Sequence, residues 1–399
     1  MAKPTIDLIR GATRVAFDAV AGVTGIVESM HADIAGGHLA AGRAGPRRAS
    51  GIAGLVYRTI RGVTRGVGAG VDLTLQPLGR HVAGLQAGLA EDVGVAVLNG
   101  IVGDRLEETG NPAAIQMVLR HQGNTLLLEQ DALAAQLPSA TGKIVVLVHG
   151  LCMSDLLWTR DGASHADRLV ALGYTPLYLR YNSGRHVSTN GREFSALLQR
   201  LLDAWPVPVE ELSLLTHSMG GLVSRSACHA GADACWLPRL RKIIFLGTPH
   251  HGAPLERAGN LFETGLGALP YARSLARLGM VRSAGITDLR WGNVVDADWQ
   301  GAGRFERRGD SRRHVPLPDG VTVYAAAALK GERPGDFKSS VLGDGLVPVD
   351  SAFGEHADPS RSLGIPPGRR WLGQGIGHFD LLHTPAVHDM VAGWFGAPG

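Results

Sequence analysis

The chain has 399 residues, of which 45% are hydrophobic and 19% are charged, and its formal net charge is +3. This length allows one large domain with an appended region, and the small net charge argues against nucleic acid as a partner. The three cysteines, Cys152, Cys228 and Cys235, are too few for a disulfide framework and favour a reducing compartment. Cys228 and Cys235 could pair in an exported protein, but free thiols are the favoured interpretation.

Residues 1–137 predict a helical N-terminal region. Apolar side chains recur at helical spacing between Ile9 and Met30 and again between Ile52 and Val71. Charged residues interrupt the first apolar segment, so a signal peptide is not expected. No stretch reaches the roughly 18 apolar residues of a membrane span. We therefore expect a cytoplasmic protein.

Two uses of this N-terminal region remain open. Basic residues outnumber acidic ones up to Arg80, so its helices could lie peripherally on a membrane, an anionic lipid or a storage-granule surface. The alternative is a helical bundle that covers the rest of the chain or mediates homo-oligomers. The bundle is favoured, because moderate amphipathicity fits any half-buried helix.

The second part, residues 138–399, alternates predicted strands and helices. Continuous apolar runs predict buried parallel strands at 143–148, 175–181, 212–215, 242–246 and 321–325. Helical stretches lie between them, at 164–172, 191–204 and 220–229. This alternation predicts an α/β fold with a doubly wound, mostly parallel sheet, which binds ligands at the carboxyl ends of its strands.

Ser218 is the predicted nucleophile. It lies between the strand 212–215 and the helix 220–229, in the sequence Thr216-His217-Ser218-Met219-Gly220. A sharp turn between a strand and a helix exposes a serine hydroxyl above the sheet, and its usual pattern is Gly-x-Ser-x-Gly. Gly220 supplies the second glycine, and Thr216 replaces the first.

A serine hydroxyl needs a base to accept its proton and a carboxylate to orient that base. His378 is the predicted base, because it follows the apolar residues 370–372 and precedes the final helix at 385–395. A loop directly after the last strand can bring a histidine to the serine. His383 and His388 are its rivals, but both lie in or beside the final helix.

The carboxylate must follow the serine and precede the histidine in chain order. Asp344 meets this condition on the loop after the strand 321–325, between two glycines. Asp319, Asp336 and Asp350 share this part of the chain. Asp350 is the main competitor, although it could instead cap a helix. Asp344 is therefore the predicted acid.

Two backbone N–H groups are needed to stabilise the oxyanion of an acyl-transfer intermediate. Met219, directly after the nucleophile, is expected to supply one of them. Leu151 is expected to supply the other, since it follows His149 and Gly150 at the end of the first strong strand. Gly150 has no side chain to obstruct a substrate carbonyl.

Residues 138–399 resemble the α/β-hydrolase esterases and lipases, particularly bacterial lipase-like proteins and the GPI inositol-deacylase-like group. Four segments carry the resemblance: 148–151, 216–221, 247–252 and 343–348. The resemblance implies an α/β-hydrolase fold with a helical lid or cap at about 253–300. The apolar face of that cap would bind an acyl chain or simply pack. His250 and His251 would shape their loop or support the oxyanion region, and the resemblance offers no matching set of metal ligands.

The predicted function is hydrolysis of carboxylic esters of small molecules or lipids through an acyl-enzyme intermediate. Ser218, His378 and Asp344 form the triad, Leu151 and Met219 supply the oxyanion donors, and no cofactor or metal is required. One alternative keeps the triad in an acyltransferase, thioesterase or amidase. Another makes the chain a lipid- or granule-surface protein whose hydrolase domain is a scaffold.

Overall fold

The computed structural model describes residues 87–160, 163–253, 283–301, 303, 306, 309–329, 344 and 346–397. The helices predicted before residue 87 and the apolar cap face at 254–282 lie outside the described residues. The α-helices of the described part are α3 (Ala87–Glu108), α4 (Gln130–Gln136), α5 (His165–Ala171), α6 (Val187–Ala204), α7 (Met219–Ala230), α10 (Ala284–Asp288), α12 (Val349–Ala352) and α13 (Pro385–Gly396). Among the described helices, none is long and apolar enough to cross a membrane.

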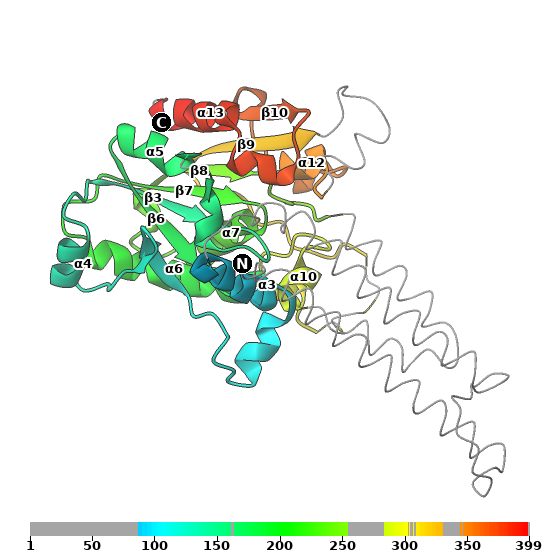
Figure 1. Ribbon diagram of the computed structural model, residues 1–399. Helices are drawn as coiled ribbons and strands as arrows, with labels where there is room; N and C mark the ends of the chain where they lie inside the picture. The colour runs from blue at the N-terminus through cyan, green and yellow to red at the C-terminus, as the bar shows by residue number, and fades with distance from the viewer. Residues whose placement is uncertain are drawn as a thin grey trace, which may run out of the picture. The chain divides into compact units, whose positions relative to one another are not determined.

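The central sheet has eight strands in the order β10-β9-β8-β7-β3-β6-β1-β2 (Figure 1). Their bounds are β1 (Val118–His121), β2 (Asn124–Thr125), β3 (Lys143–Val148), β6 (Tyr174–Arg180), β7 (Glu211–His217), β8 (Leu240–Leu246), β9 (Thr322–Leu329) and β10 (Arg370–Gln374). Neighbours pair in parallel from β6 to β10, whereas β1 pairs antiparallel with both β6 and β2. The mostly parallel sheet predicted from the sequence is confirmed.

Strands β1 and β2 lie in the stretch for which only helices were predicted. β1 has four residues, Val-Leu-Arg-His, and only Leu119 among them is buried. So short a strand with two basic side chains gives no continuous apolar run, and its pairing with β6 depends on residues more than 50 positions later in the chain. The sheet therefore begins before the predicted domain boundary at residue 138.

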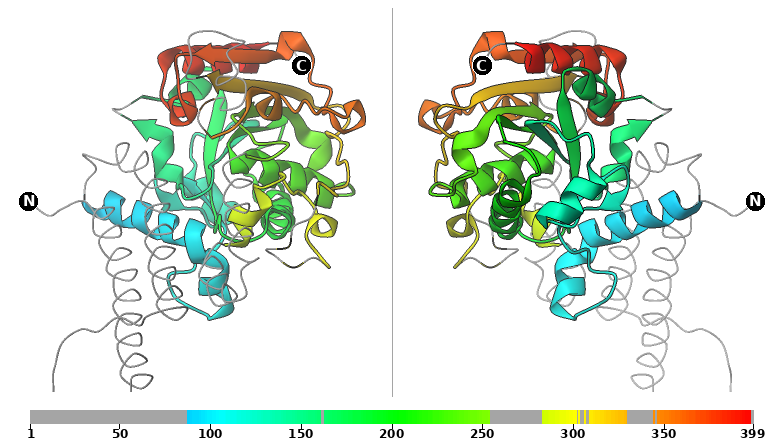
Figure 2. Two further views of the ribbon diagram at one scale, coloured as in Figure 1. Left: turned by 90° about the vertical axis from the view of Figure 1, so that its right-hand side faces the viewer. Right: turned by 90° about the vertical axis from the view of Figure 1, so that its left-hand side faces the viewer.

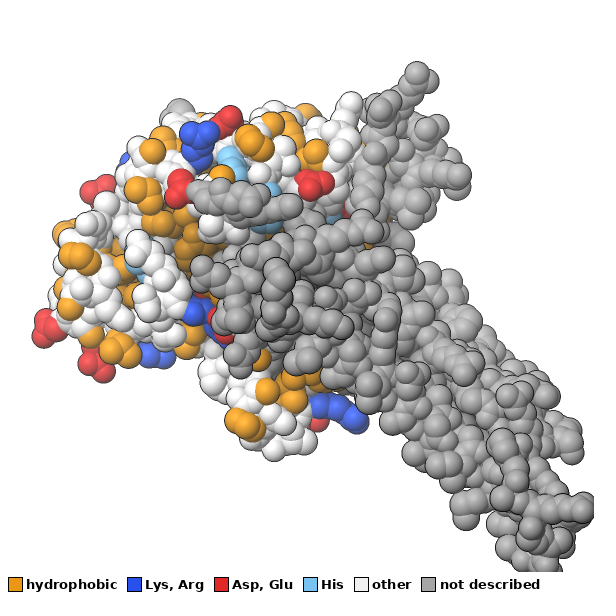
Figure 3. All heavy atoms as spheres, in the orientation of Figure 1, with side chains coloured by type: hydrophobic (Ala, Val, Ile, Leu, Met, Phe, Trp, Pro, Cys, Tyr) orange, Lys and Arg blue, Asp and Glu red, His pale blue; other side chains and the backbone are white. Residues whose placement is uncertain are grey.

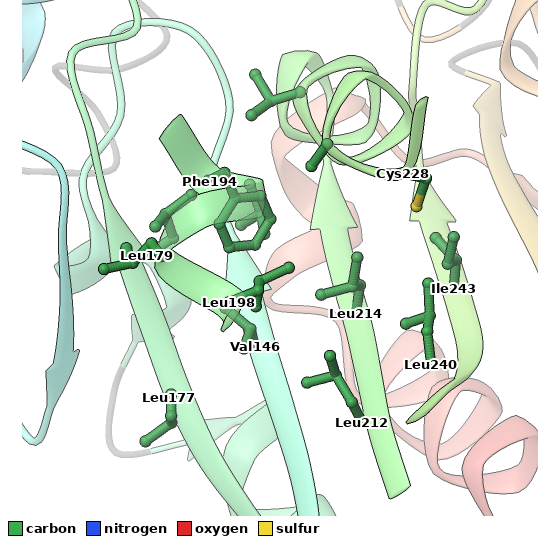
Figure 4. Packing of buried hydrophobic residues seen from close by; sticks show 14 of the residues in the cluster. Val146, Leu177, Leu179, Phe194, Leu198, Leu212, Leu214, Cys228, Leu240 and Ile243 are labelled. Carbon is green, nitrogen blue, oxygen red and sulfur yellow. The ribbon is translucent and has the colours of Figure 1, made fainter. Parts of the chain in front are cut away.

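The inner strands are apolar along their whole length because both faces of the sheet are covered. Ile144, Val146 and Val148 of β3 share one core cluster with side chains of α6 and α7, including Phe194 and Leu198 (Figure 4). Val145 and Leu147 alternate with them and are equally buried, so they face the other side of the sheet. Helices α5 and α13 pack against each other there (Figures 1 and 2).

The order of the strands changes direction at β3. The chain passes from β3 to β6 on one side and then to β7 on the other side of β3. The loops that leave the carboxyl ends of β3 and β7 therefore diverge, which in open α/β sheets opens the ligand site. Gly150 follows β3 and Ser218 follows β7, so both lie at this point.

The three cysteines are free thiols in the structure, as the sequence favoured. Cys228 is buried in the core against the sheet (Figure 4), whereas Cys235 is exposed. Burial raises the pKa of the Cys228 thiol to about 12, and it raises that of Cys152 equally. Both thiols are therefore protonated at neutral pH, and Cys228 acts as a small core residue.

Candidate active site

Ser218 has a strained backbone at the turn between β7 and α7. Its φ is 54° and its ψ is −125°, a combination that a residue with a side chain adopts only when its surroundings enforce it. Its N–H donates to the Leu246 carbonyl oxygen at 2.9 Å, and its carbonyl oxygen accepts from the Gly221 N–H at 3.0 Å. The turn is thus fixed from the neighbouring strand β8 and from its own helix, and the serine stays partly exposed.

Small residues around the turn allow it to form. A Cβ added to Gly220 would lie 2.4 Å from the Val148 carbonyl oxygen, and one added to Gly150 would lie 2.9 Å from the Ser218 Cβ. Thr216 needs no such space, because it is still within β7 and its hydroxyl donates to the Ile244 carbonyl oxygen at 3.2 Å. The replacement of the first glycine by threonine therefore fits the observed turn.

The predicted acid and base form a buried pair. Nδ1 of His378 lies 2.6 Å from Oδ2 of Asp344, and the two side chains are only 4% and 2% exposed. Oδ1 of Asp344 accepts the N–H groups of Leu346 and Val347 at 2.9 and 2.8 Å. The carboxylate of Asp344 can only accept a hydrogen bond, so the neutral imidazole of His378 carries its proton on Nδ1. Its basic nitrogen is then Nε2.

The structure brings His378 and Ser218 to the same end of β8. The Ser218 N–H is hydrogen-bonded to the carbonyl oxygen of Leu246, the last residue of β8, and Gly247 is the next residue of the chain. A Cβ on Gly247 would lie 3.0 Å from both Cε1 and Nδ1 of His378, so the imidazole packs directly on this glycine. His378 is the first residue of the 3₁₀ helix η7 (His378–Leu382), which follows β10 after three residues.

His217 also belongs to this cluster, although the sequence suggested no role for it. Its Nε2 lies 3.1 Å from the His378 carbonyl oxygen, and the two imidazole rings are 4.6 Å apart between centroids. Burial, followed by the neighbouring His378, holds the pKa of His217 well below its usual value. His217 is therefore neutral and donates from Nε2, which ties the backbone of His378 to the strand that carries Ser218. Its position next to the serine was the only signal in the sequence.

The predicted oxyanion donors follow the ends of two neighbouring strands, Met219 after β7 and Leu151 after β3. Met219 is the first residue of α7, so its N–H has no acceptor within the helix. Leu151 precedes Cys152, whose φ of 59° turns the chain and whose N–H donates to the Ser183 hydroxyl at 3.1 Å. Because a Cβ added to Gly150 would lie 2.9 Å from the Ser218 Cβ, the segment with Leu151 runs beside the nucleophile.

His149 holds the segment that contains Gly150 and Leu151 in place through contacts of its ring and its carbonyl oxygen. Its ring stacks on Tyr181 with centroids 4.3 Å apart, and its carbonyl oxygen accepts the Tyr181 hydroxyl at 2.8 Å. Burial lowers the pKa of His149 to about 4, so the ring is neutral at pH 7 and donates from Nδ1 to the Gly150 carbonyl oxygen at 2.9 Å. These bonds fix the end of β3 in the conformation that faces Ser218.

The rival residues lie in other surroundings. Nε2 of His388 is 2.9 Å from the Leu382 carbonyl oxygen, within the C-terminal segment. Asp350 is exposed in the first turn of α12, and Asp336 lies outside the described residues.

Figure 3 shows histidine side chains at the surface beside hydrophobic ones on the face seen in Figure 1. Across the described ranges, no group of three or more His, Cys, Asp or Glu side chains is arranged to hold a metal ion.

A family model described as a PGAP1-like alpha/beta domain matches residues 139–308. No curated protein matches the chain. Among solved structures, the mature Bacillus licheniformis lipase BlEst2 is similar at 21% identity over 63% of this chain and 91% of its own, with a TM-score of 0.40. Lipase 1 from Pelosinus fermentans is similar at 15% identity over 65% and 99%, with a TM-score of 0.39. The metagenomic carboxyl esterase MGS0156 is similar at 17% identity over 76% and 87%, with a TM-score of 0.37.

The match at 139–308 lies within the part that resembles α/β-hydrolases in sequence, and it spans β3 to β8. The strand–turn–helix around Ser218 and the parallel sheet are the defining parts of that fold. The predicted α/β-hydrolase fold is therefore confirmed.

Proposed function

We propose that this α/β-hydrolase is a serine esterase or lipase that cleaves carboxylic esters through an acyl-enzyme intermediate. The observation that carries the proposal is the buried Asp344–His378 pair, whose Oδ2 and Nδ1 atoms are 2.6 Å apart. The pair lies at the end of β8, and the strained backbone of Ser218 is hydrogen-bonded to the last residue of that strand. A nucleophile, a base and an orienting carboxylate with this order and fold position form the acyl-transfer constellation.

In the first half of the reaction, the Ser218 hydroxyl oxygen attacks the ester carbonyl carbon. Nε2 of His378 accepts the hydroxyl proton, while the Nδ1–H keeps donating its hydrogen bond to Asp344. The carboxylate stabilises the resulting imidazolium without being protonated itself. Two backbone N–H groups and the imidazole donate hydrogen bonds to the buried oxygens of Asp344.

The N–H groups of Met219 and Leu151 stabilise the negative charge on the tetrahedral intermediate. Both are backbone donors on segments that hydrogen bonds already hold, one after β7 and one after β3, so little reorganisation is needed when the charge develops. Removing one such donor typically costs about a hundredfold to a thousandfold in rate. The neutral ring of His149 contributes by holding the strand end from which Leu151 follows.

His378 then returns its proton to the departing alcohol oxygen, and the acyl group remains on Ser218. In the second half, the same imidazole takes a proton from water, whose oxygen attacks the acyl carbonyl carbon. The bond between that carbon and the Ser218 oxygen then breaks, His378 gives the proton to the Ser218 oxygen, and the acid is released. The alcohol and acid groups are chosen by the surroundings of the serine. An acyl transfer reaction would use the same residues with an alcohol in place of water.

The test is hydrolysis of para-nitrophenyl butyrate by the wild type, Ser218→Ala and Ser224→Ala. Ser224 is a matched control, because it is a buried serine of the same helix whose hydroxyl has no hydrogen-bond partner among the described residues. We expect kcat/KM to fall about 10⁴-fold or more in Ser218→Ala and to stay near the wild-type value in Ser224→Ala. Full activity of Ser218→Ala would overturn the proposal. Added alcohol separates hydrolysis from transfer.

A further inference from the structure

A second group of basic side chains, away from Ser218, lines a small pocket that is open to solvent. Arg225 of α7, His250 of the loop after β8, and Arg312, Arg313 and Arg361 from the later loops are among its lining residues. Arg225 lies seven residues after Ser218, which is about 10 Å along the helix. The pocket is therefore separate from the reacting serine.

Arg225 is buried with donors to spare. It is only 5% exposed, and its two described hydrogen bonds are from Nη2 to the Val315 carbonyl oxygen at 2.7 Å and from Nη1 to His250 Nδ1 at 3.5 Å. Its Nε has no partner in the described structure. A guanidinium has five N–H donors, and a buried donor without an acceptor is costly. The Nε–H of Arg225 therefore lacks an acceptor among the described residues.

His250 adds a second donor to the same pocket. Because Arg225 can only donate, His250 Nδ1 must accept, and the proton of the neutral ring is then on Nε2. Burial, followed by the charge of Arg225, holds the pKa of His250 well below its usual value, so the ring is neutral. Its buried Nε2 has no partner within the described residues. Two neighbouring residues therefore both lack an acceptor.

The charge of the pocket selects an anion as that acceptor. Four arginines, Arg225, Arg312, Arg313 and Arg361, face two carboxylates, Asp298 and Asp310. Asp310 is paired with Arg312 at 2.7 Å and with Arg361 at 2.8 Å. Asp298 accepts the backbone N–H groups of Val294, Val295 and Arg313. In the part of the chain that the structure describes, no carboxylate is within ion-pair distance of Arg225.

We propose that this pocket, called the Arg225 pocket, binds a phosphate-type oxyanion. The planar guanidinium of Arg225 and the Nε2–H of His250 supply its donors, and the surplus positive charge of the neighbouring arginines draws it in. The anion is either free phosphate or the phosphate of a lipid headgroup, which share this chemistry. The pocket lies outside the triad, so the inference holds whichever bond the enzyme cleaves.

The experiment measures binding to the full chain in a phosphate-free buffer of low ionic strength, by calorimetry and by thermal unfolding. One arm uses inorganic phosphate, and the other uses glycerophosphoglycerol, the water-soluble headgroup part of an anionic phospholipid. The variants are Arg225→Met and Arg313→Met. Arg239→Met, which removes an exposed positive charge on the surface between α7 and β8, is the control for net charge.

We expect at least one probe to bind the wild type and raise its unfolding midpoint. Its Kd should increase at least tenfold in Arg225→Met, severalfold in the surface variant Arg313→Met, and little in Arg239→Met. Binding of inorganic phosphate alone identifies free phosphate as the ligand of the pocket. Binding of glycerophosphoglycerol, a phosphodiester, identifies a lipid headgroup as the ligand. If neither probe binds, or if Kd is the same in all variants, the proposal is wrong.

Discussion

The serine turn and the acid–base pair are built in different ways. Ser218 is held by backbone hydrogen bonds to β8 and α7 and by the absence of side chains at Gly150 and Gly220. Asp344 and His378 come from separate loops after β9 and β10, and one side-chain contact joins them. The nucleophile is thus fixed by the sheet itself, whereas the proton relay depends on a few tertiary contacts of His378, with Asp344, His217 and Gly247. Changes in the first should disturb folding, and changes in the second should disturb rate alone.

The largest effect is expected from breaking the acid–base pair. Asp344→Asn keeps the shape of the side chain, but its amide can no longer stabilise an imidazolium or fix the Nδ1–H tautomer. We expect kcat on para-nitrophenyl butyrate to fall about 10³- to 10⁴-fold with little change in unfolding temperature. Asp350→Asn is the matched control, because Asp350 is an exposed acid six residues later. A large loss in Asp350→Asn and none in Asp344→Asn would assign the acid to the rival.

The next effect concerns the histidines under the site. Folded His149 has a pKa of about 4 against 6.5 unfolded, and the pKa of His217 is lowered as well. Below pH 6.5 the unfolded chain binds protons that the folded chain excludes, so stability falls as pH falls. For His149 the loss between pH 6.5 and 4 approaches ~3 kcal/mol. Urea unfolding at pH 7, 6 and 5 should show this fall in wild type and a weaker one in His149→Phe. Equal stability at pH 7 and 5 would contradict it.

Gly220→Ala probes the serine turn. The new Cβ would lie 2.4 Å from the Val148 carbonyl oxygen and 2.6 Å from that of His149, so backbone must move. We expect a loss of about 1–3 kcal/mol in the free energy of unfolding, measured by urea denaturation. Gly393→Ala in α13 has nothing within 4 Å of the added Cβ and should gain up to about 1 kcal/mol from helix propensity. Equal stability of the two variants would show that the turn tolerates a side chain.

The smallest effect is expected at the link between the two regions. His217→Phe removes the hydrogen bond to the His378 carbonyl oxygen, and a small displacement of the imidazole should lower kcat about tenfold. His217→Gln, which keeps a donor, should recover part of this loss. Both variants should leave KM nearly unchanged, since His217 is fully buried. A change in KM alone would point to a substrate contact instead.

The sequence predicted those parts of the fold and site that depend on local pattern. The continuous apolar runs gave β3, β6, β7, β8 and β9, because strands buried on both faces cannot alternate with polar residues. The order of Ser218, Asp344 and His378 followed from the fold. β1 was missed, since its four residues have little apolar pattern and its partner is distant. The contact of His217 with His378 joins residues 161 positions apart, which no single sequence pattern reveals.

The central claim is that Ser218 is the nucleophile whose proton His378 accepts. Its most direct measurement is labelling of the intact protein with a fluorophosphonate, followed by mass spectrometry of the peptide that contains residue 218. We expect a single adduct on Ser218 in the wild type and at least a hundredfold slower labelling in His378→Ala. In Ser218→Ala we expect no adduct. An adduct on another residue, or equal labelling rates in the wild type and His378→Ala, would contradict it.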